Sequence, residues 1–342
     1  MNQIKKFSWR GIFKDITSEE VLSEIVARED VTKVSFYVGI DPTGPELHLG
    51  HLLSFISAKL IQEEFNFKPI FILGGFTGSI GDPSGKTNER VLLRDETIAK
   101  NIESIKGRIK YFCEKLQITD YLIINNKEFY EEMSIIDFYR DFGKHFNVNR
   151  MLAKDMVKKR LETTGISYTE FSYQLFQAID FFQLNKKHNC KLQIGGSDQW
   201  GNILTGVELI GKTNSMNNNV LGITTNLLVD EAGKKIGKSE GKPLWVNEEL
   251  VSSYQFFQYF FNLSDELAGS LLSKLTLITE KEYLDVKSRH DQEPFKRLLQ
   301  NELAKRFLGT FYQEDSYQNA LNISQWLFKR EYDKQRLLII KC

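Results

Sequence analysis

Residues 37–51 read Tyr37-Val38-Gly39-Ile40-Asp41-Pro42-Thr43-Gly44-Pro45-Glu46-Leu47-His48-Leu49-Gly50-His51. The start of this stretch, with the apolar residues before it, predicts a strand at about 34–40, and a turn rich in proline and glycine follows. From about His48 the apolar residues recur at helical spacing, so a helix begins there and continues to about Phe65. A helix N-terminus has unpaired N–H groups and a partial positive charge, so this arrangement suits a phosphate group.

Two histidines mark the start of that helix. His48 and His51 stand three residues apart, which places both on one face of the first turn. Gly50 between them leaves room for a flat ring to approach the backbone. For this motif alone, a surface pair of histidines and half of a metal site stay open as alternatives.

Short apolar runs alternate with amphipathic stretches along the first part of the chain. Strands are expected at about 34–40, 69–73 and 121–124, and helices at about 48–65 and 92–117. This alternation predicts an α/β fold with a Rossmann-type parallel sheet. Ligands of such sheets bind at the carboxyl ends of the strands, so the turn after residue 40 is expected at the site.

A glycine-rich loop follows the strand at 69–73. It contains Gly81-Asp82-Pro83-Ser84-Gly85-Lys86, with Arg90 shortly beyond, so a carboxylate and two cations accompany backbone that a ligand can approach. The spacing of a Walker phosphate-binding loop fails here by one residue, which weakens a kinase or ATPase interpretation. A flexible surface loop is the alternative.

Residues 171–182 predict a mostly apolar helix, with Thr169 as a cap. Tyr173, Gln177 and Asp180 share one face of this helix. A buried carboxylate needs a donor, so Asp180 is expected to bind a ligand, unless a lysine or arginine of the fold pairs with it.

Residues 191–202 repeat the pattern of strand, glycine turn and helix start, and a last strand is expected at 224–229. Gly196 lets a ligand lie on the backbone, and Asp198 is placed to accept from a sugar hydroxyl or an ammonium group. A cap on the following helix is the alternative role for Asp198.

Two domains are predicted. Residues 1–246 form the Rossmann-type domain, and an aromatic and apolar helical insertion at about 129–165 is either core or a dimer face. From 247 to about 330 only helical patterns occur, so an all-helical domain follows. Residues 331–342 form a short tail.

The composition is that of an ordinary globular protein. The 342 residues are 41% hydrophobic and 26% charged, with 45 basic and 45 acidic side chains, so any nucleic-acid surface must be a local patch. The three cysteines have no metal-ligand spacing and form no disulfide framework, which favours the cytoplasm. We expect no membrane span, no signal peptide and no dedicated protein metal site.

Taken together, these motifs resemble a known family. His48-Leu49-Gly50-His51 and, far downstream, Lys235-Ile236-Gly237-Lys238-Ser239 resemble the two signatures of class I aminoacyl-tRNA synthetases. From about Trp9 to residue 328 the chain looks like a bacterial-type tyrosyl-tRNA synthetase. Leu49 replaces a frequent isoleucine, and Ile236-Gly237 replaces Met-Ser, a variation common among the tyrosine enzymes.

The resemblance implies activation of L-tyrosine by ATP, which gives tyrosyl-adenylate and pyrophosphate, followed by transfer of tyrosine to the 3′ end of tRNA(Tyr). Mg²⁺ would accompany ATP and be held mainly by phosphates and water. The implied catalytic residues are His48, His51, Lys235, Lys238, Lys86 and Arg90. The implied tyrosine-binding residues are Tyr37 and Asp180 for the phenol, Asp82, Tyr173 and Gln177 for the ammonium group, and Gln199 near the carboxylate. The implied ATP-binding residues are Gly39, Asp41, His48, Gly50, His51, Ser54, Gly196, Asp198 and Lys238.

The resemblance also implies a homodimer formed through the insertion and an anticodon-binding role for residues 247–330. Family members usually continue into a small RNA-binding domain resembling ribosomal protein S4, and we expect that domain to be absent here. Three other functions stay open: a tryptophanyl-tRNA synthetase, a nucleotidyltransferase with an H-x-G-H motif, and an RNA-binding cofactor on the same scaffold. The pair Tyr37 and Asp180 favours tyrosine over tryptophan.

Overall fold

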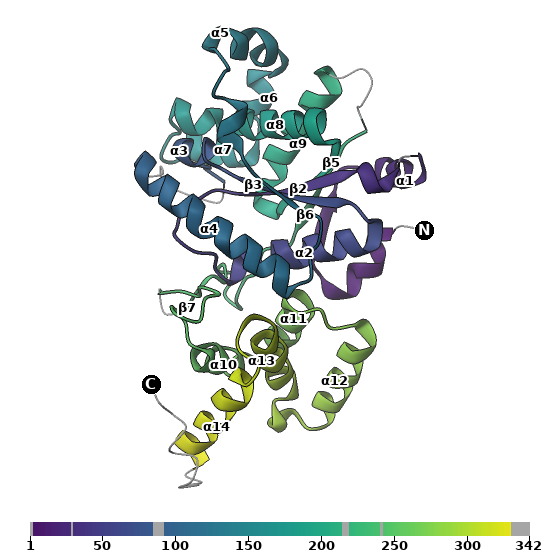
Figure 1. The fold of residues 1–342 in the computed structure, drawn as a ribbon, viewed down its shortest axis with the longest axis vertical. Coiled ribbons are helices and arrows are strands. Elements are labelled where there is room, and N and C mark those ends of the chain that lie inside the picture. Colours follow the sequence, from purple (N-terminus) through teal and green to yellow (C-terminus); the bar gives the residue numbers. More distant parts are fainter. Residues whose placement is uncertain (1–2, 29, 85–91, 214–218, 240–241, 330–342) are drawn as a thin grey trace. The chain divides into compact units, whose positions relative to one another are not determined.

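A computed structural model describes residues 3–28, 30–84, 92–213, 219–239 and 242–329 (Figure 1). The chain divides into two compact units, Met1–Val229 and Asp230–Cys342. This boundary precedes the expected one at residue 246. The boundary lies there because the segment after Val229 forms hydrogen bonds with residues near it in the second unit. These bonds include the hairpin of β7 (Lys238–Ser239) and β8 (Lys242–Pro243). The tail at 331–342 lies outside the described residues.

The first unit contains a sheet of six strands in the order β1-β6-β5-β2-β3-β4. Its strands are β1 (Phe13–Ile16), β2 (Ser35–Ile40), β3 (Lys68–Leu73), β4 (Leu122–Asn125), β5 (Cys190–Gly196) and β6 (Leu221–Thr225). Every pair is parallel except β1 with β6, which is antiparallel. The sheet is therefore mixed, and the parallel Rossmann-type arrangement holds for five of its strands.

Several predicted details were wrong at the sheet edges. β1 was not predicted, because four residues with two charged side chains carry no periodic signal. β6 ends at Thr225 rather than running over 224–229. β4 is half-buried, since it is an edge strand with a neighbour on one side only.

Helices cover both faces of the sheet. The helices α2 (Leu49–Phe65) and α4 (Asp95–Lys115) lie on one face, while α8 (Tyr168–His188) and α9 (Trp200–Thr213) lie on the other (Figure 1). The ring of Phe55 in α2 stacks on Phe71 of β3 at 4.8 Å and meets the edge of Phe112 in α4 at 5.0 Å. Aromatic packing thus fixes α2 and α4 to the sheet.

The chain reverses its direction across the sheet between β2 and β5. After β2 it builds β3 and β4 on one side, and it then returns to β5 and β6 on the other. β2 and β5 are parallel neighbours, with Tyr37 opposite Gln193. Residues that follow these two strands therefore meet at a crevice where such sheets bind ligands.

The insertion between β4 and α8 consists of short helices. They are α5 (Ile135–Asp137), a π-helical turn η4 (Phe138–Phe142), α6 (Val148–Leu152) and α7 (Asp155–Leu161). Helix α8 begins earlier than predicted, and its cap is Ser167, whose hydroxyl accepts from the Glu170 N–H, rather than Thr169.

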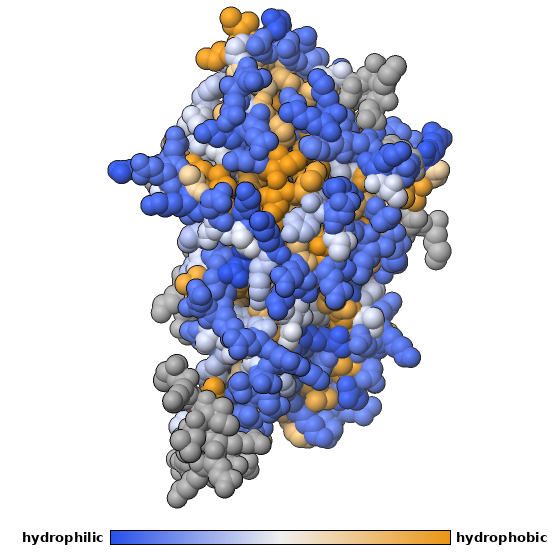
Figure 2. All heavy atoms as spheres, in the orientation of Figure 1, coloured by the Kyte–Doolittle hydropathy of each residue, from blue (hydrophilic) through white to orange (hydrophobic). Residues whose placement is uncertain are grey.

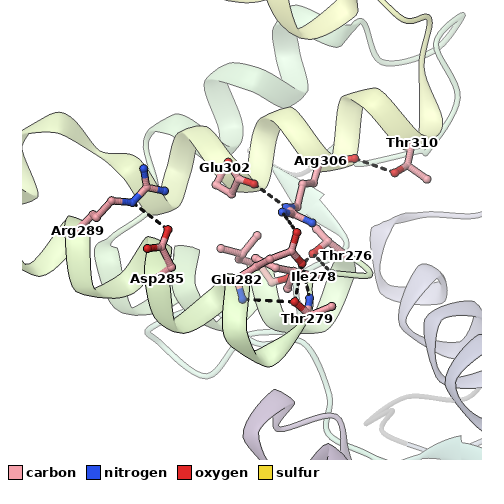
Figure 3. Close-up of polar contacts among 10 residues, drawn as sticks. Thr276, Ile278, Thr279, Glu282, Asp285, Arg289, Glu302, Arg306 and Thr310 are labelled. Carbon is pink, nitrogen blue, oxygen red and sulfur yellow. Dashed lines mark hydrogen bonds and ion pairs between the residues drawn. The ribbon is translucent and has the colours of Figure 1, made fainter. Parts of the chain in front are cut away.

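The second unit is all-helical apart from the short hairpin. It contains α10 (Ser253–Phe261), α11 (Asp265–Leu275), α12 (Glu280–Gln292), α13 (Leu298–Phe311) and α14 (Ser316–Lys329). Phe256, Phe260 and Phe307 pack together in its core. Figure 3 shows Arg306 of α13 between Glu302 and Glu282, which ties α13 to α12.

Candidate active site

The two histidines hold the start of α2 in a fixed geometry. His48 is the N-cap, and its Nδ1 accepts from the Gly50 N–H at 3.1 Å. The Nδ1 atom of His51 accepts from the His48 N–H at 3.1 Å. The two rings stack with centroids 3.8 Å apart. The sequence placed this pair correctly, and the structure adds that histidine plays the capping role usually taken by serine or aspartate.

These bonds determine the protonation of the rings. A ring nitrogen that accepts a hydrogen bond carries no proton, so each neutral imidazole has its proton on Nε2. Burial, and then the neighbouring His48, lowers the pKa of His51 to about 3. His51 is therefore a neutral hydrogen-bond donor rather than a cation.

The turn after β2 is tied to the other face of the sheet through Asp41. The Oδ1 atom of Asp41 accepts from the Thr77 hydroxyl at 2.7 Å, and Oδ2 accepts from the Tyr173 hydroxyl at 2.8 Å. A Cβ at position 74 would overlap the Asp41 carboxylate, so Gly74 is required where β3 ends. The sequence predicted that Asp41 belongs to the site but not that it binds Tyr173.

Asp180 lies almost fully buried, with 4% of its surface exposed. Its Oδ2 accepts from Asn126 Nδ2 at 2.9 Å, and its Oδ1 lies 2.7 Å from the Tyr130 hydroxyl. Among the described residues, the partners of Asp180 are therefore neutral, and no lysine or arginine of these residues pairs with it. Burial raises the pKa of Asp180 to about 8, although these two hydrogen bonds oppose the shift.

The surroundings of Tyr130 support a protonated Asp180. The Tyr130 hydroxyl also lies 2.8 Å from the Phe176 carbonyl, and its single proton can serve only one of the two acceptors. A neutral carboxyl group at Asp180 can donate to Tyr130 while Tyr130 donates to Phe176. The Tyr37 hydroxyl is buried nearby without a hydrogen-bond partner among the described residues. The surroundings of Asp180 thus include a buried hydroxyl that has no hydrogen-bond partner among the described residues.

Asn126 is a site residue that sequence reasoning missed. Its Oδ1 accepts from the Phe76 N–H at 2.8 Å, and its Nδ2 donates to Asp180 and to the Thr77 hydroxyl at 3.0 Å. Because Thr77 donates to Asp41, these bonds connect Asp180 with Asp41. A signal was present, since Asn126 directly follows the last residue of β4, and ligands of such sheets bind at the carboxyl ends of the strands.

A second polar cluster joins the glycine-rich loop to α9. Gln199 Nε2 donates to Asp82 Oδ2 at 2.7 Å, and the Ser84 N–H donates to Asp82 Oδ1 at 2.9 Å. Asn202, also missed from the sequence, donates to Gln199 Oε1 at 3.1 Å and to Gln177 Oε1 at 3.2 Å. The predicted residues Asp82, Gln177 and Gln199 are thus brought together.

The cluster around Tyr173 is acidic. Burial raises the pKa of Tyr173 well above its usual value, and the charges of Asp41 and Asp82 add to that shift. Carboxylates gathered around one side chain favour a cationic group among them. This arrangement suits the ammonium group of an amino acid.

The remaining predicted residues occupy the crevice edges or lie elsewhere. Gly39 is an exposed residue of β2 next to its end, Gly50 and Ser54 lie half-buried on α2, Gly196 ends β5, and Asp198 follows it. Lys86 and Arg90 lie outside the described residues, as does the side chain of Lys238. Lys235 is exposed in the second unit, so its part in the site stays a prediction.

Metal-binding clusters and membrane-crossing helices are both absent from the described parts of the chain. No cluster of three or more histidine, cysteine, aspartate or glutamate side chains is arranged to hold a metal ion there. No helix in those parts combines the length and the apolar character needed to cross a bilayer.

The chain is similar to known proteins over nearly its whole length. A family model described as tRNA synthetases class I (W and Y) matches residues 29–329. The tyrosine–tRNA ligase of Listeria monocytogenes is 42% identical over 328 residues, which are 96% of this chain and 77% of that protein. The tyrosine–tRNA ligase of Mycoplasma mycoides is 39% identical over 325 residues, which are 95% of this chain and 76% of that protein. A solved structure of a C-terminally truncated mitochondrial tyrosyl-tRNA synthetase from Coccidioides posadasii has a TM-score of 0.79 at 27% identity and covers 94% of this chain and 92% of that one.

Proposed function

The chain belongs to the class I tRNA synthetases for tryptophan and tyrosine, and on this premise we propose how its site recognises tyrosine and activates it with ATP. The enzyme is a tyrosine–tRNA ligase. The main support for the proposed site is the buried Asp180 together with the Tyr37 hydroxyl, which is buried and has no hydrogen-bond partner among the described residues.

The phenol of the substrate binds between Tyr37 and Asp180. A phenolic hydroxyl can donate to one of these groups and accept from the other, which satisfies the orphan hydroxyl of Tyr37. The ammonium group of the substrate binds among Asp82, Tyr173 and Gln177, where the carboxylates gather. Gln199, which donates a hydrogen bond to Asp82, lies near the substrate carboxylate.

ATP binds along the crevice between β2 and β5. Its adenosine contacts Gly39, Asp41, Gly50, Ser54, Gly196 and Asp198. ATP arrives with Mg²⁺, which is held mainly by phosphate oxygens and water, since the described residues offer no carboxylate cage.

A tyrosine carboxylate oxygen attacks the α-phosphorus of ATP, and the bond from that phosphorus to the bridging oxygen breaks, which releases pyrophosphate. His48 and His51 donate from Nε2 to phosphate oxygens, whose negative charge grows in the transition state. Lys235, Lys238, Lys86 and Arg90 supply positive charge around the same phosphates. No proton must leave the nucleophile, because the carboxylate is already ionised.

We also propose the remaining partners. The tyrosyl group passes to the terminal adenosine of tRNA(Tyr), and the helical second unit contacts the anticodon. The insertion forms a homodimer interface, because it exposes apolar side chains at the α5 end of the first unit, the orange patch at the top of Figure 2. The buried, unpaired thiols of Cys113 and Cys190 suit the reducing cytoplasm.

Tryptophan is the less supported alternative substrate, since the curated relatives from Listeria monocytogenes and Mycoplasma mycoides are tyrosine–tRNA ligases. ATP–pyrophosphate exchange with each of the twenty amino acids tests the proposal. Tyrosine should support exchange and tryptophan should not. Exchange with tryptophan would overturn the proposed specificity, and no exchange with any amino acid would favour an RNA-binding cofactor.

A further inference from the structure

Side chains of helix α4 form hydrogen bonds with both ends of the turn that precedes the two histidines. Asn101 Nδ2 donates to the Pro42 carbonyl at 2.9 Å. Two turns further along the same face of α4, Arg108 Nε and Nη2 donate to Glu46 Oε1 and Oε2 at 2.9 and 3.0 Å. The segment between Asp41 and His48 is thus anchored by a helix that contributes no predicted site residue.

The Glu46–Arg108 pair is sheltered from water. Glu46 is 6% exposed, and the Arg108 side chain is 17% exposed and lies over the Tyr111 ring. The pairing is bidentate, so it specifies an orientation as well as a contact. Glu46 Oε1 also accepts from the Leu47 N–H at 3.1 Å, directly before the histidine cap.

The same turn is confined from a second side. A Cβ at Gly78 would lie 2.9 Å from Pro42 Cδ, so the loop after β3 packs closely against the turn. Asp41, at the beginning of the turn, binds Thr77 and Tyr173. Thr77 and Tyr173 thus hold the beginning of the turn at Asp41, and the Glu46–Arg108 pair holds its other end.

We propose that Glu46 and Arg108 are positioning residues for tyrosine activation, which hold His48 and His51 where they meet the phosphates of ATP. The inference rests on the proposed role of these histidines. A displacement of the turn would misplace the Nε2 donors in the transition state while leaving the tyrosine pocket intact. The pair should therefore act on kcat and leave tyrosine affinity unchanged.

The test compares Glu46→Gln, Arg108→Lys, and the double variant Glu46→Ala with Arg108→Ala. The double variant leaves no unpaired buried charge, which protects its folding. We expect kcat for ATP–pyrophosphate exchange to fall on the order of tenfold to a hundredfold in the double variant, as for a small misplacement of catalytic groups. Arg108→Lys should retain more activity than the double variant, because lysine keeps the positive charge although it cannot form the bidentate pair with Glu46.

The matched control removes another ion pair of the first unit. Lys68 Nζ lies 2.6 Å from Asp120 Oδ1 at the start of β3, the end of the strand remote from the turn. Lys68→Ala should leave kcat unchanged. His51→Ala tests the premise separately: if it also leaves kcat unchanged, the proposed histidine role is wrong.

Two outcomes would overturn the positioning inference while His51→Ala remains impaired. One is an unchanged kcat in the double variant. The other is a parallel loss of kcat, tyrosine affinity and thermal stability in all Glu46 and Arg108 variants, which would show a purely structural pair. A loss of kcat with tyrosine affinity retained supports it.

Discussion

Asn126 Nδ2 donates to Asp180 Oδ2 at 2.9 Å, and both side chains are almost fully buried. Through Thr77 and Asp41 the same network reaches Tyr173, 2.8 Å from Asp41 Oδ2. The group that we propose for the substrate phenol and the group that we propose for its ammonium end are therefore parts of one hydrogen-bonded network. A substitution at one end of this network should therefore affect the groups at its other end.

The first prediction concerns selectivity for tyrosine. Asp180→Ala should lower tyrosine-dependent exchange by on the order of a hundredfold, because the substrate hydroxyl would be buried without its partner. Exchange with phenylalanine should change little, since that substrate has no hydroxyl to satisfy. Asp285→Ala, on the exposed surface of α12, is the control. Near-normal tyrosine exchange in the Asp180 variant would make Asp180 structural.

The second prediction concerns stability and pH. The pKa of Asp180 is raised to about 8 in the folded protein, so the folded state retains a proton that the unfolded state has lost. Without substrate, the contribution of Asp180 to the free energy of unfolding should fall as the pH rises from about 4 to about 8. Asp180→Asn removes this titration, so its melting temperature should exceed that of the wild type by a margin that grows over this range. A constant margin would show that Asp180 is ionised throughout.

The third prediction concerns the charge of His51. With a pKa lowered to about 3, the ring should stay neutral at every pH used for assay. The Cε1 proton of His51 should therefore show no chemical-shift change between pH 8 and pH 5 in an NMR titration. The urea-unfolded protein provides the control, in which histidines titrate near 6.5. A midpoint near 6 in the folded protein would mean that His51 acts as a cation.

The fourth prediction concerns assembly. Ile135 and Ile136 are 77% and 72% exposed in α5, more than an isolated surface ordinarily tolerates in neighbouring apolar residues. Sedimentation should show a dimer at micromolar concentration, and Ile136→Asp should convert it to a monomer by burying a charge in the interface. Leu284→Asp, an equally drastic change at an exposed position of α12, should leave the dimer intact. A monomeric wild type would exclude the proposed interface.

The fifth prediction concerns the start of α12. Glu282 accepts from the Thr279 N–H at 2.8 Å in a capping box and from Arg306 at 2.9 Å, and the Thr279 bonds chiefly lower its pKa to about 2 (Figure 3). Its stabilising effect should be complete above pH 4.5 and disappear as the pH falls toward 2. Thr279→Ala should cost about 1 kcal/mol. Glu282→Gln should be less stable than the wild type at pH 7, and denaturant unfolding at pH 7 and pH 3 should show that difference shrinking.

Local patterns in the sequence were sufficient for much of the fold. The strand, turn and helix around His48, the face shared by Tyr173 and Asp180, and the helical character after residue 247 all involve residues within a few turns of one another. Backbone periodicity and capping act over that range, so a pattern of side chains predicts them.

Only the tertiary structure showed which side chains form hydrogen bonds with one another. Asn126 and Asp180 lie 54 positions apart, Glu46 and Arg108 lie 62 apart, and Tyr173 lies 132 positions from Asp41. A buried carboxylate in the sequence demands a donor, but any of many donors could supply it. Which donor does so depends on the strand order, because the reversal between β2 and β5 brings together residues that no local pattern connects. The sequence therefore named most of the described groups that we propose as substrate contacts, whereas the neutral partners that hold them, and the antiparallel pairing of β1 with β6, followed only from the packed sheet.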